Sequence, residues 1–225
     1  MYEKLEIYLS KERLNKYLEV ANNNKEKAIE LYEANLKYSS KMYILLSCFE
    51  VFLRNSINIQ MAKYNIDWIL NISFLNSKIL NNLRKTKSAN KETIIFYKKF
   101  FEKQTNMLNT AIFSLQEDNK TINNNYLTSR LNFGFWTRLF NKSYETEIWN
   151  KYLYKIFNKP IKRGLIEFRL NELRRLRNRI AHNECILNLK HTPLEYYDFI
   201  IEFLSMIDLD ITNWLKKQMS RDLFK

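Results

Sequence analysis

The sequence is poor in the residues that shape turns. Its 225 residues include only two glycines, Gly134 and Gly164, and two prolines, Pro160 and Pro193. A β or α/β fold of this length needs many glycines in its turns, so the scarcity predicts an all-α protein. The length suits a single domain over residues 1–225 with a sizeable core. The content of 46% hydrophobic and 15% aromatic residues excludes a mainly disordered chain.

Cysteine, histidine and long apolar runs are also scarce. Cys48 and Cys185 lie far apart and form no CxxC pair, which excludes a disulfide framework and a zinc site. With only two histidines in the chain, we expect no metal and no cofactor. The most apolar stretch, 42–53, is too short to cross a bilayer and contains Glu50. The polar N-terminus does not resemble a signal peptide, so we expect a reduced, cytoplasmic protein that does not bind membranes.

Apolar residues recur at three- and four-residue steps, which predicts helices. We expect a long helix from Asn23 or Asn24 to about Tyr64, with a break near 38–40 as an alternative. Shorter helical pieces are expected over 66–86, and a second long helix over 88–115. The region of roughly 66–140 is expected to form a helical insertion between the early helix and a later helix that carries the motif described below.

Cap residues predict several helix ends. Ser10 and Ser143 are expected N-caps, and a helix is expected to begin just after Pro160 and continue to about Ala181 or beyond. Thr192 is followed by a proline and then by Glu195, the arrangement of a capping box. The helix that starts there is expected to be the final one of the chain, and because it is apolar on most faces we expect it to be buried.

The net charge of +13 indicates a polyanionic partner, although a lysine-rich surface alone would also produce it. The excess is concentrated, because 159–190 holds nine basic and only three acidic residues, whereas 191–214 holds five acids and no Lys or Arg. The basic residues are Lys159, Lys162, Arg163, Arg169, Arg174, Arg175, Arg177, Arg179 and Lys190. Arginine dominates this cluster, and a guanidinium can bind phosphate in a bidentate manner. Some of these arginines are expected to pair with acids, but successive helical residues are rotated by about 100° and cannot all face one neighbour.

His182 ends the arginine-rich run. Leu173, Leu176 and Ile180 form an apolar stripe at helical spacing, and Asn178 lies one turn before His182. Arg177 lies five residues before His182, which on an ideal helix is an offset of about 140°. The two side chains can approach one another only if the helix ends near His182, or if two copies combine their motifs in a dimer.

These residue types suit RNA cleavage without a metal. Attack of a 2′-OH on the adjacent phosphate needs a base, an acid and cations for the phosphoryl oxygens. Histidine serves the proton transfers and arginine the phosphate. By itself the pattern is weak, because a lone histidine on a basic helix is usually a surface or capping residue.

Three separated segments resemble a known family. Arg177 to His182 looks like the R-x(4–6)-H signature of the HEPN superfamily, in which a polar residue, often Asn, follows the arginine. The wider LRRLRNRIAHNE, together with LNFGFWTRLF (131–140), resembles the Abi-like (AbiD/AbiF) family of bacterial abortive-infection proteins. FEVFLRN (49–55) resembles that family's early E-x-x-L-R helix.

The resemblance implies an all-α, HEPN-type helical bundle with additional helices, usually a homodimer whose two motifs line a shared cleft. Many members are metal-independent endoribonucleases that act as toxins in antiphage defence or toxin–antitoxin systems. It assigns Arg177 and His182 as the catalytic pair and Asn178 as the accessory polar residue. We further expect RNA contacts from basic residues on and around this helix, namely Lys162, Arg163, Arg174, Arg175 and Arg179.

Three features of the sequence allow more than one interpretation. Glu50 and Arg54 either form an intrahelical ion pair or lie near the cleft as accessory residues. The aromatic residues around Gly134 belong either to the core, which is the more common role, or to a surface that stacks on bases. Glycine at this position allows a tight bend or close packing.

The function expected is an endoribonuclease with RNA as its substrate, and the basic surface also suits an RNA antitoxin. The first alternative is a HEPN protein that binds RNA without cleaving it, with an affinity that depends on salt. The second is an interaction protein whose basic patch meets an acidic protein or a membrane surface. We rank that alternative last, because no separate amphipathic Lys/Arg helix of the membrane-surface type is present.

Overall fold

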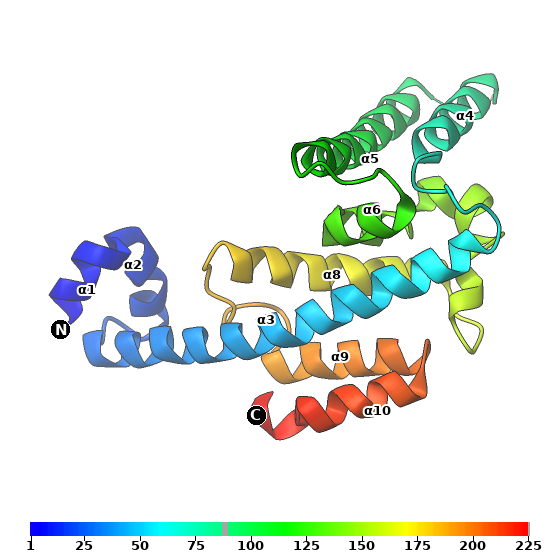
Figure 1. Cartoon of the computed structure of the whole chain (residues 1–225). Helices are drawn as coiled ribbons and strands as arrows, with labels where there is room; N and C mark the ends of the chain where they lie inside the picture. The colour runs from blue at the N-terminus through cyan, green and yellow to red at the C-terminus, as the bar shows by residue number, and fades with distance from the viewer. Residues whose placement is uncertain (87–89, 225) are drawn as a thin grey trace. The chain divides into compact units, whose positions relative to one another are not determined.

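A computed structural model of the chain describes residues 1–86 and 90–224. Within these residues the chain forms helices and no strand, which confirms the all-α prediction (Figure 1). The chain divides into two compact units, one of residues 1–49 and 172–225 and the other of residues 50–171. The predicted insertion, 66–140, lies inside the second unit. Two long helices, α3 (Lys25–Ala62) and α8 (Arg163–Ala181), contribute to both units.

The first unit is built on the N-terminal part of α3 and the C-terminal part of α8. Its other elements are α1 (Tyr2–Leu9), α2 (Lys11–Val20), α9 (Pro193–Ser205), α10 (Leu209–Gln218) and the short η4 (Arg221–Phe224). Helices α9 and α10 pack as a hairpin (Figure 1). The rings of Phe49 and Phe203 meet edge to face, with centroids 5.2 Å apart. Six residues of α9 are buried, which confirms that this helix belongs to the core.

The second unit contains the α4–α5 hairpin and an aromatic core. Its elements are α4 (Ile72–Lys85), α5 (Lys91–Glu117), α6 (Asn124–Arg130), α7 (Phe133–Arg138), η1 (Lys142–Tyr144), η2 (Glu145–Trp149) and η3 (Leu153–Ile156), with the adjoining parts of α3 and α8. Trp68, Phe135 and Trp136 form a ring cluster with centroids 5.2–6.5 Å apart. These rings are buried, so the aromatic residues of α7 form core rather than surface.

Asparagine performs the local tasks for which many proteins use glycine. Five N-terminal caps are asparagine side chains that accept a backbone N–H, and they are Asn24, Asn90, Asn123, Asn132 and Asn141. Four of the five non-glycine residues with a positive φ among those described are also asparagines, namely Asn22, Asn23, Asn119 and Asn183. Because asparagine tolerates the left-handed conformation, the chain can end helices sharply without glycine.

Most predicted helix ends are confirmed. Helix α3 begins at Lys25, and its 38 residues form one helix without a break at 38–40. Ser10 caps α2, and Thr192 and Glu195 form the predicted capping box of α9. The expected start of the second long helix, Ser88, lies outside the described residues.

Two local predictions are wrong. Ser143 lies inside η1 rather than at a cap, because Asn141 accepts the backbone N–H and the hydroxyl of Ser143 instead. The C-terminal region forms two helices rather than one. Asp208 caps the second of them by accepting the N–H of Ile211.

Candidate functional site

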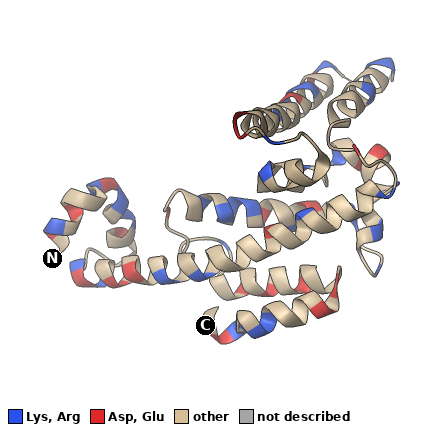
Figure 2. Ribbon diagram, in the orientation of Figure 1, with Lys and Arg blue, Asp and Glu red and all other residues tan. Residues whose placement is uncertain are grey.

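The apolar stripe predicted on the motif helix is confirmed. Leu173, Leu176 and Ile180 are buried, whereas Asn178 and His182 are exposed and Arg177 is half-buried. Burial of one face fixes the rotation of α8 about its own axis. The polar residues of the motif are therefore held on the remaining faces. Figure 2 shows several basic positions along α8, whereas α9 carries acidic residues and no basic ones.

His182 lies where α8 ends. The N–H of Asn183 donates to the carbonyl of Ile180 at 3.0 Å, and the N–H of Glu184 donates to that of Arg179 at 2.8 Å. With Asn183 at a φ of 53°, these two bonds form a Schellman motif in which His182 is the C-cap. The imidazole thus projects from the last turn of a helix rather than from its middle.

The turn after His182 is anchored by side chains from distant parts of the chain. Arg13, in α2, donates to the carbonyl of Asn183 at 2.7 Å. Asn35, buried in α3, accepts the N–H of Ile186 at 2.7 Å, and Arg179 donates to the carbonyl of Cys185 at 3.1 Å. Cys185 is itself part of a buried cluster with residues of α1, α2 and α3. The backbone that carries His182 is therefore fixed on both sides of the turn.

Sequence reasoning missed Arg13 and Asn35. They lie 170 and 151 residues from the backbone groups they bind. No local pattern links positions so far apart, so only the fold reveals these contacts.

We predict that Asn35→Ala destabilises the protein by about 1–3 kcal/mol, because it leaves the buried N–H of Ile186 without an acceptor. The loss is measurable as a shift of the urea-unfolding midpoint. Asn213→Ala, at an exposed position of α10 in the same unit, is the matched control and should change stability by less than about 0.5 kcal/mol. Equal effects of the two substitutions would contradict the role of Asn35.

The motif side chains are available to a ligand. Among the described residues, none forms a side-chain hydrogen bond or an ion pair with Arg177, Asn178 or His182. The motif thus offers an imidazole, an amide and a guanidinium with unused hydrogen-bonding capacity. An imidazole can transfer protons, and a guanidinium can stabilise charge on phosphate.

The neighbouring arginines are partly committed to local partners. Arg175 donates to Glu172 at 2.6 Å on its own helix, and Arg179 lies 3.8 Å from Glu184. Burial lowers the pKa of the Arg174 guanidinium, and the adjacent charge of Arg175 adds to this effect. The ion pairs of Arg175 and Arg179 are thus made near the motif, within α8 and the turn that follows it.

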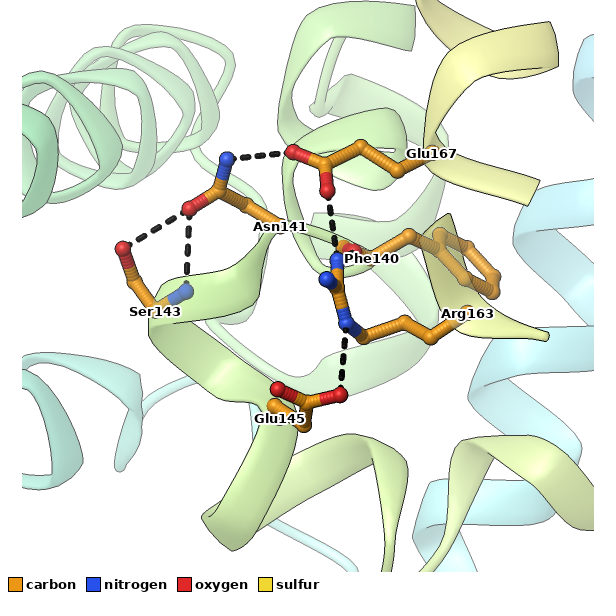
Figure 3. Close-up of polar contacts among 6 residues, drawn as sticks. All are labelled: Phe140, Asn141, Ser143, Glu145, Arg163 and Glu167. Carbon is orange, nitrogen blue, oxygen red and sulfur yellow. Dashed lines mark hydrogen bonds and ion pairs between the residues drawn. The ribbon is translucent and has the colours of Figure 1, made fainter. Parts of the chain in front are cut away.

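Arg163 lies in a polar network at the start of α8 (Figure 3). Its guanidinium donates to Glu145 at 3.2 Å, to Glu167 at 2.5 Å and to the carbonyl of Phe140 at 2.7 Å. Asn141 donates to the other oxygen of Glu167, and the Arg163 side chain is only 11% exposed. Since these partners occupy the guanidinium, we do not include Arg163 among the RNA contacts proposed below. The adjacent Lys162 is exposed.

We predict that Arg163→Gln lowers stability by about 1.5–3 kcal/mol, because it removes hydrogen bonds from a charged donor to two carboxylates and a carbonyl. Lys162→Gln is the control, because it removes a charge at the exposed neighbouring position. Urea unfolding measures both effects. A stable Arg163→Gln protein with weakened RNA binding would contradict the structural role.

Glu50 and Arg54, the predicted accessory residues, fall in the second unit, whereas the motif falls in the first. Both side chains are half-buried on α3. Arg54 donates to the carbonyl of Ser129 at 3.5 Å. This contact joins α3 to the C-terminal end of α6, within one unit.

Gly134 allows close packing rather than a bend. A Cβ at this position would lie 3.0 Å from Oδ1 of Asn132, the atom that caps α7, and 3.4 Å from Cε of Met107. The backbone of Gly134 does not adopt a positive φ. Glycine is therefore needed here for space and not for an unusual backbone conformation.

Within residues 1–86 and 90–224, no three His, Cys, Asp or Glu side chains gather as the ligands of a metal ion. No helix in the same residues combines the length and the apolar composition needed to cross a bilayer.

Comparison with known proteins gives one finding. Neither the curated proteins nor the solved structures yield a match to this chain. The family model described as Abi-like protein matches residues 2–188, which is most of the chain and includes α8 and His182. Membership in this family supports a role in abortive-infection defence. The chain belongs to the Abi-like protein family.

Proposed function

We propose that this protein is a metal-independent endoribonuclease of the HEPN type, acting as the toxin component of a bacterial abortive-infection system. The observation that carries the proposal is the exposed imidazole of His182 at an anchored helix end, five residues after Arg177. Family membership supports the defence role, and the arginine-rich cluster supports RNA as the substrate.

The proposed reaction is attack of an RNA 2′-OH on the adjacent phosphate. His182 takes a proton from the nucleophile or gives one to the 5′-oxygen that leaves. Arg177 binds the phosphoryl oxygens and stabilises the charge that develops on them. Asn178, one turn before His182, orients the imidazole or bonds to a phosphate oxygen.

We propose that the active form is a homodimer. The reaction needs both a base and an acid, and one chain offers only one motif histidine. A second copy of the chain supplies another imidazole. Although α8 ends at His182, the N–H of this residue still donates to the carbonyl of Asn178 at 3.0 Å, so the angular offset from Arg177 is retained. A second copy can bring an Arg177 and a His182 together despite this offset. Sedimentation should give twice the mass of one chain.

Incubation of the protein with cellular RNA in EDTA tests the proposed function. We expect discrete fragments, because no step requires a divalent ion. RNA that is bound in a salt-dependent manner and never cleaved would favour the alternative function, a non-catalytic RNA-binding HEPN protein. Absence of both binding and cleavage at moderate salt would contradict an RNA-directed function.

A further inference from the structure

A second cluster of nucleic-acid-binding residue types lies in the second unit, away from the motif in sequence. It consists of Tyr64, Tyr152, Tyr154 and Lys155, and we refer to it as the tyrosine–lysine surface. The side chains of Tyr64 and Tyr154 are 49% and 46% exposed, and Lys155 lies next to both rings. Exposed rings next to a lysine are not required by the packing of the core and can mark an interaction site.

Lys155 holds this surface together. Its Nζ donates to the hydroxyl of Tyr64 at 2.7 Å. The same ammonium lies 5.0 Å from the centroid of the Tyr64 ring and 5.6 Å from that of Tyr154. The rings of Tyr64 and Tyr152 are in contact, with centroids 4.4 Å apart. The rings of Tyr64 and Tyr152 thus hold each other in place, and Lys155 links Tyr64 to Tyr154.

Two cavities adjoin the surface. One has a volume of about 480 Å³ and is lined by Trp149, Tyr154, Lys155, Phe157, Lys159 and Pro160, among others. The other, of about 280 Å³, is lined in part by Tyr64, Tyr152 and Lys151. The larger volume lies in the range of about 300–1,000 Å³ that is common for small-ligand sites. Its aromatic and basic lining suits a flat, electron-rich ring attached to a phosphate.

The charge around the larger cavity is positive, whereas the smaller one is also lined by Glu147, which pairs with Lys78 and Lys151. The segment from Ile148 to Ile166 contains five basic residues and no acid. Lys151 and Arg163 are neutralised by glutamates, but no described carboxylate pairs with Lys155, Lys159 or Lys162. Three lysine charges therefore remain available to a polyanion.

We propose that the tyrosine–lysine surface binds single-stranded RNA. Bases stack on Tyr64 and Tyr154, and the backbone phosphates contact Lys155, Lys159 and Lys162. Exposed rings next to lysines are the arrangement by which proteins bind single strands with little dependence on sequence. An acidic peptide would use the lysines but would gain little from flat exposed rings. The inference rests on the proposed function in taking RNA as the ligand, and it assigns a binding surface separate from the catalytic motif.

The test measures the affinity of a fluorescein-labelled 12-nucleotide single-stranded RNA by anisotropy. The full-length chain carries His182→Ala throughout, so that the RNA stays intact. Tyr64→Ala and Tyr154→Ala should each raise Kd by about tenfold, since stacking on one ring contributes about 1–3 kcal/mol per base. Tyr154→Phe keeps the ring and should bind like the parent. Lys159→Gln should reduce the slope of log Kd against log salt by about 0.7.

Tyr126→Ala is the matched control. Tyr126 lies in the same unit, is 42% exposed and has Lys120 5.8 Å from its ring centroid, but among the described residues Lys120 lies over this ring alone, whereas Lys155 lies over two. This substitution should change Kd by less than about twofold. Equal effects of Tyr126→Ala and Tyr154→Ala would overturn the proposal. The proposal would also be overturned if AMP displaced the labelled RNA at the nucleotide concentration at which unlabelled RNA displaces it. Displacement by polyglutamate at an equal concentration of side chains would overturn it as well.

Crosslinking provides a measurement that does not require a substitution in the tyrosine–lysine surface. RNA that contains 5-iodouridine, irradiated with the His182→Ala protein, should crosslink to Tyr64 or Tyr154, as mapped by mass spectrometry. Crosslinks confined to the segment around α8 and its turn would overturn the proposal. The cleavage assay in EDTA is independent of both measurements. If RNA is cleaved but its binding does not depend on the tyrosines, the proposed tyrosine–lysine surface is contradicted and the proposed catalysis stands. If binding depends on the tyrosines but no RNA is cleaved, the proposed catalysis is contradicted and the surface stands.

Discussion

The His182→Ala protein is expected to lose about 10²–10⁴-fold in the rate of RNA cleavage while it remains folded. A positioned general acid or base contributes about this much. The fold should persist because the imidazole is exposed and the bonds that end α8 are made by backbone groups. Single-turnover cleavage in EDTA measures the rate, and circular dichroism and the melting temperature report on folding.

Rescue by a small molecule separates a chemical role of His182 from a structural one. In His182→Gly the missing side chain leaves space next to the substrate, so added imidazole should restore part of the activity. Lys190→Ala, which removes an exposed basic residue eight positions later, should cleave at nearly the normal rate. Undiminished cleavage by His182→Ala would remove this residue from the mechanism.

Trp136→Ala is expected to cost about 3–5 kcal/mol of stability, the usual loss for truncating a fully buried tryptophan. Trp136 is 0% exposed, contacts the rings of Trp68 and Phe135, and donates its indole N–H to the carbonyl of Leu131 at 3.2 Å. The cavity left by the substitution would lie in the aromatic core of the second unit. Urea unfolding, followed by far-UV circular dichroism, measures the loss.

Trp214→Ala is the control for this substitution. Trp214 lies on α10 and is 48% exposed, so its truncation should cost far less. The alternative role of the aromatic segment, stacking on bases, makes the opposite prediction. A Trp136→Ala protein with normal stability but weakened RNA binding would support stacking and contradict the core assignment.

Helix positions could be predicted from the sequence because their causes are local. The apolar stripe Leu173, Leu176 and Ile180 and the capping box of Thr192 and Glu195 lie within one or two turns. The end of α8 at Ala181 agrees with the prediction of about Ala181 or beyond, but the sequence did not predict how the helix ends. Because glycine is scarce, the residue in the left-handed conformation after α8 is Asn183, and asparagine also serves as a cap and in turns. The sequence therefore did not indicate which asparagine would end the helix.

Only the part of the candidate site that lies in one continuous segment of the sequence could be predicted. The spacing from Arg177 to His182 is visible in one segment, whereas the anchors Arg13 and Asn35 are brought in by the fold. Local reasoning also assigned Arg163 to RNA. The pairing of Arg163 with Glu167 is an i,i+4 contact that local spacing permits. Glu145, however, lies 18 residues before Arg163 in a separate helical segment, η2, so local spacing does not reveal that contact. The tyrosine–lysine surface was missed because Tyr64 and Lys155 are 91 residues apart.

The chemistry of the RNA ends tests the central claim most directly. Products made in EDTA by the wild-type protein can be labelled at their 5′ ends and examined by mass spectrometry at their 3′ ends. Attack by the 2′-OH predicts 5′-hydroxyl ends and 2′,3′-cyclic phosphate ends, and a 2′-deoxy substitution at the cleaved position should block the reaction. Fragments with 5′-phosphate and 3′-hydroxyl ends, or cleavage that requires a divalent metal, would contradict the mechanism assigned to His182 and Arg177.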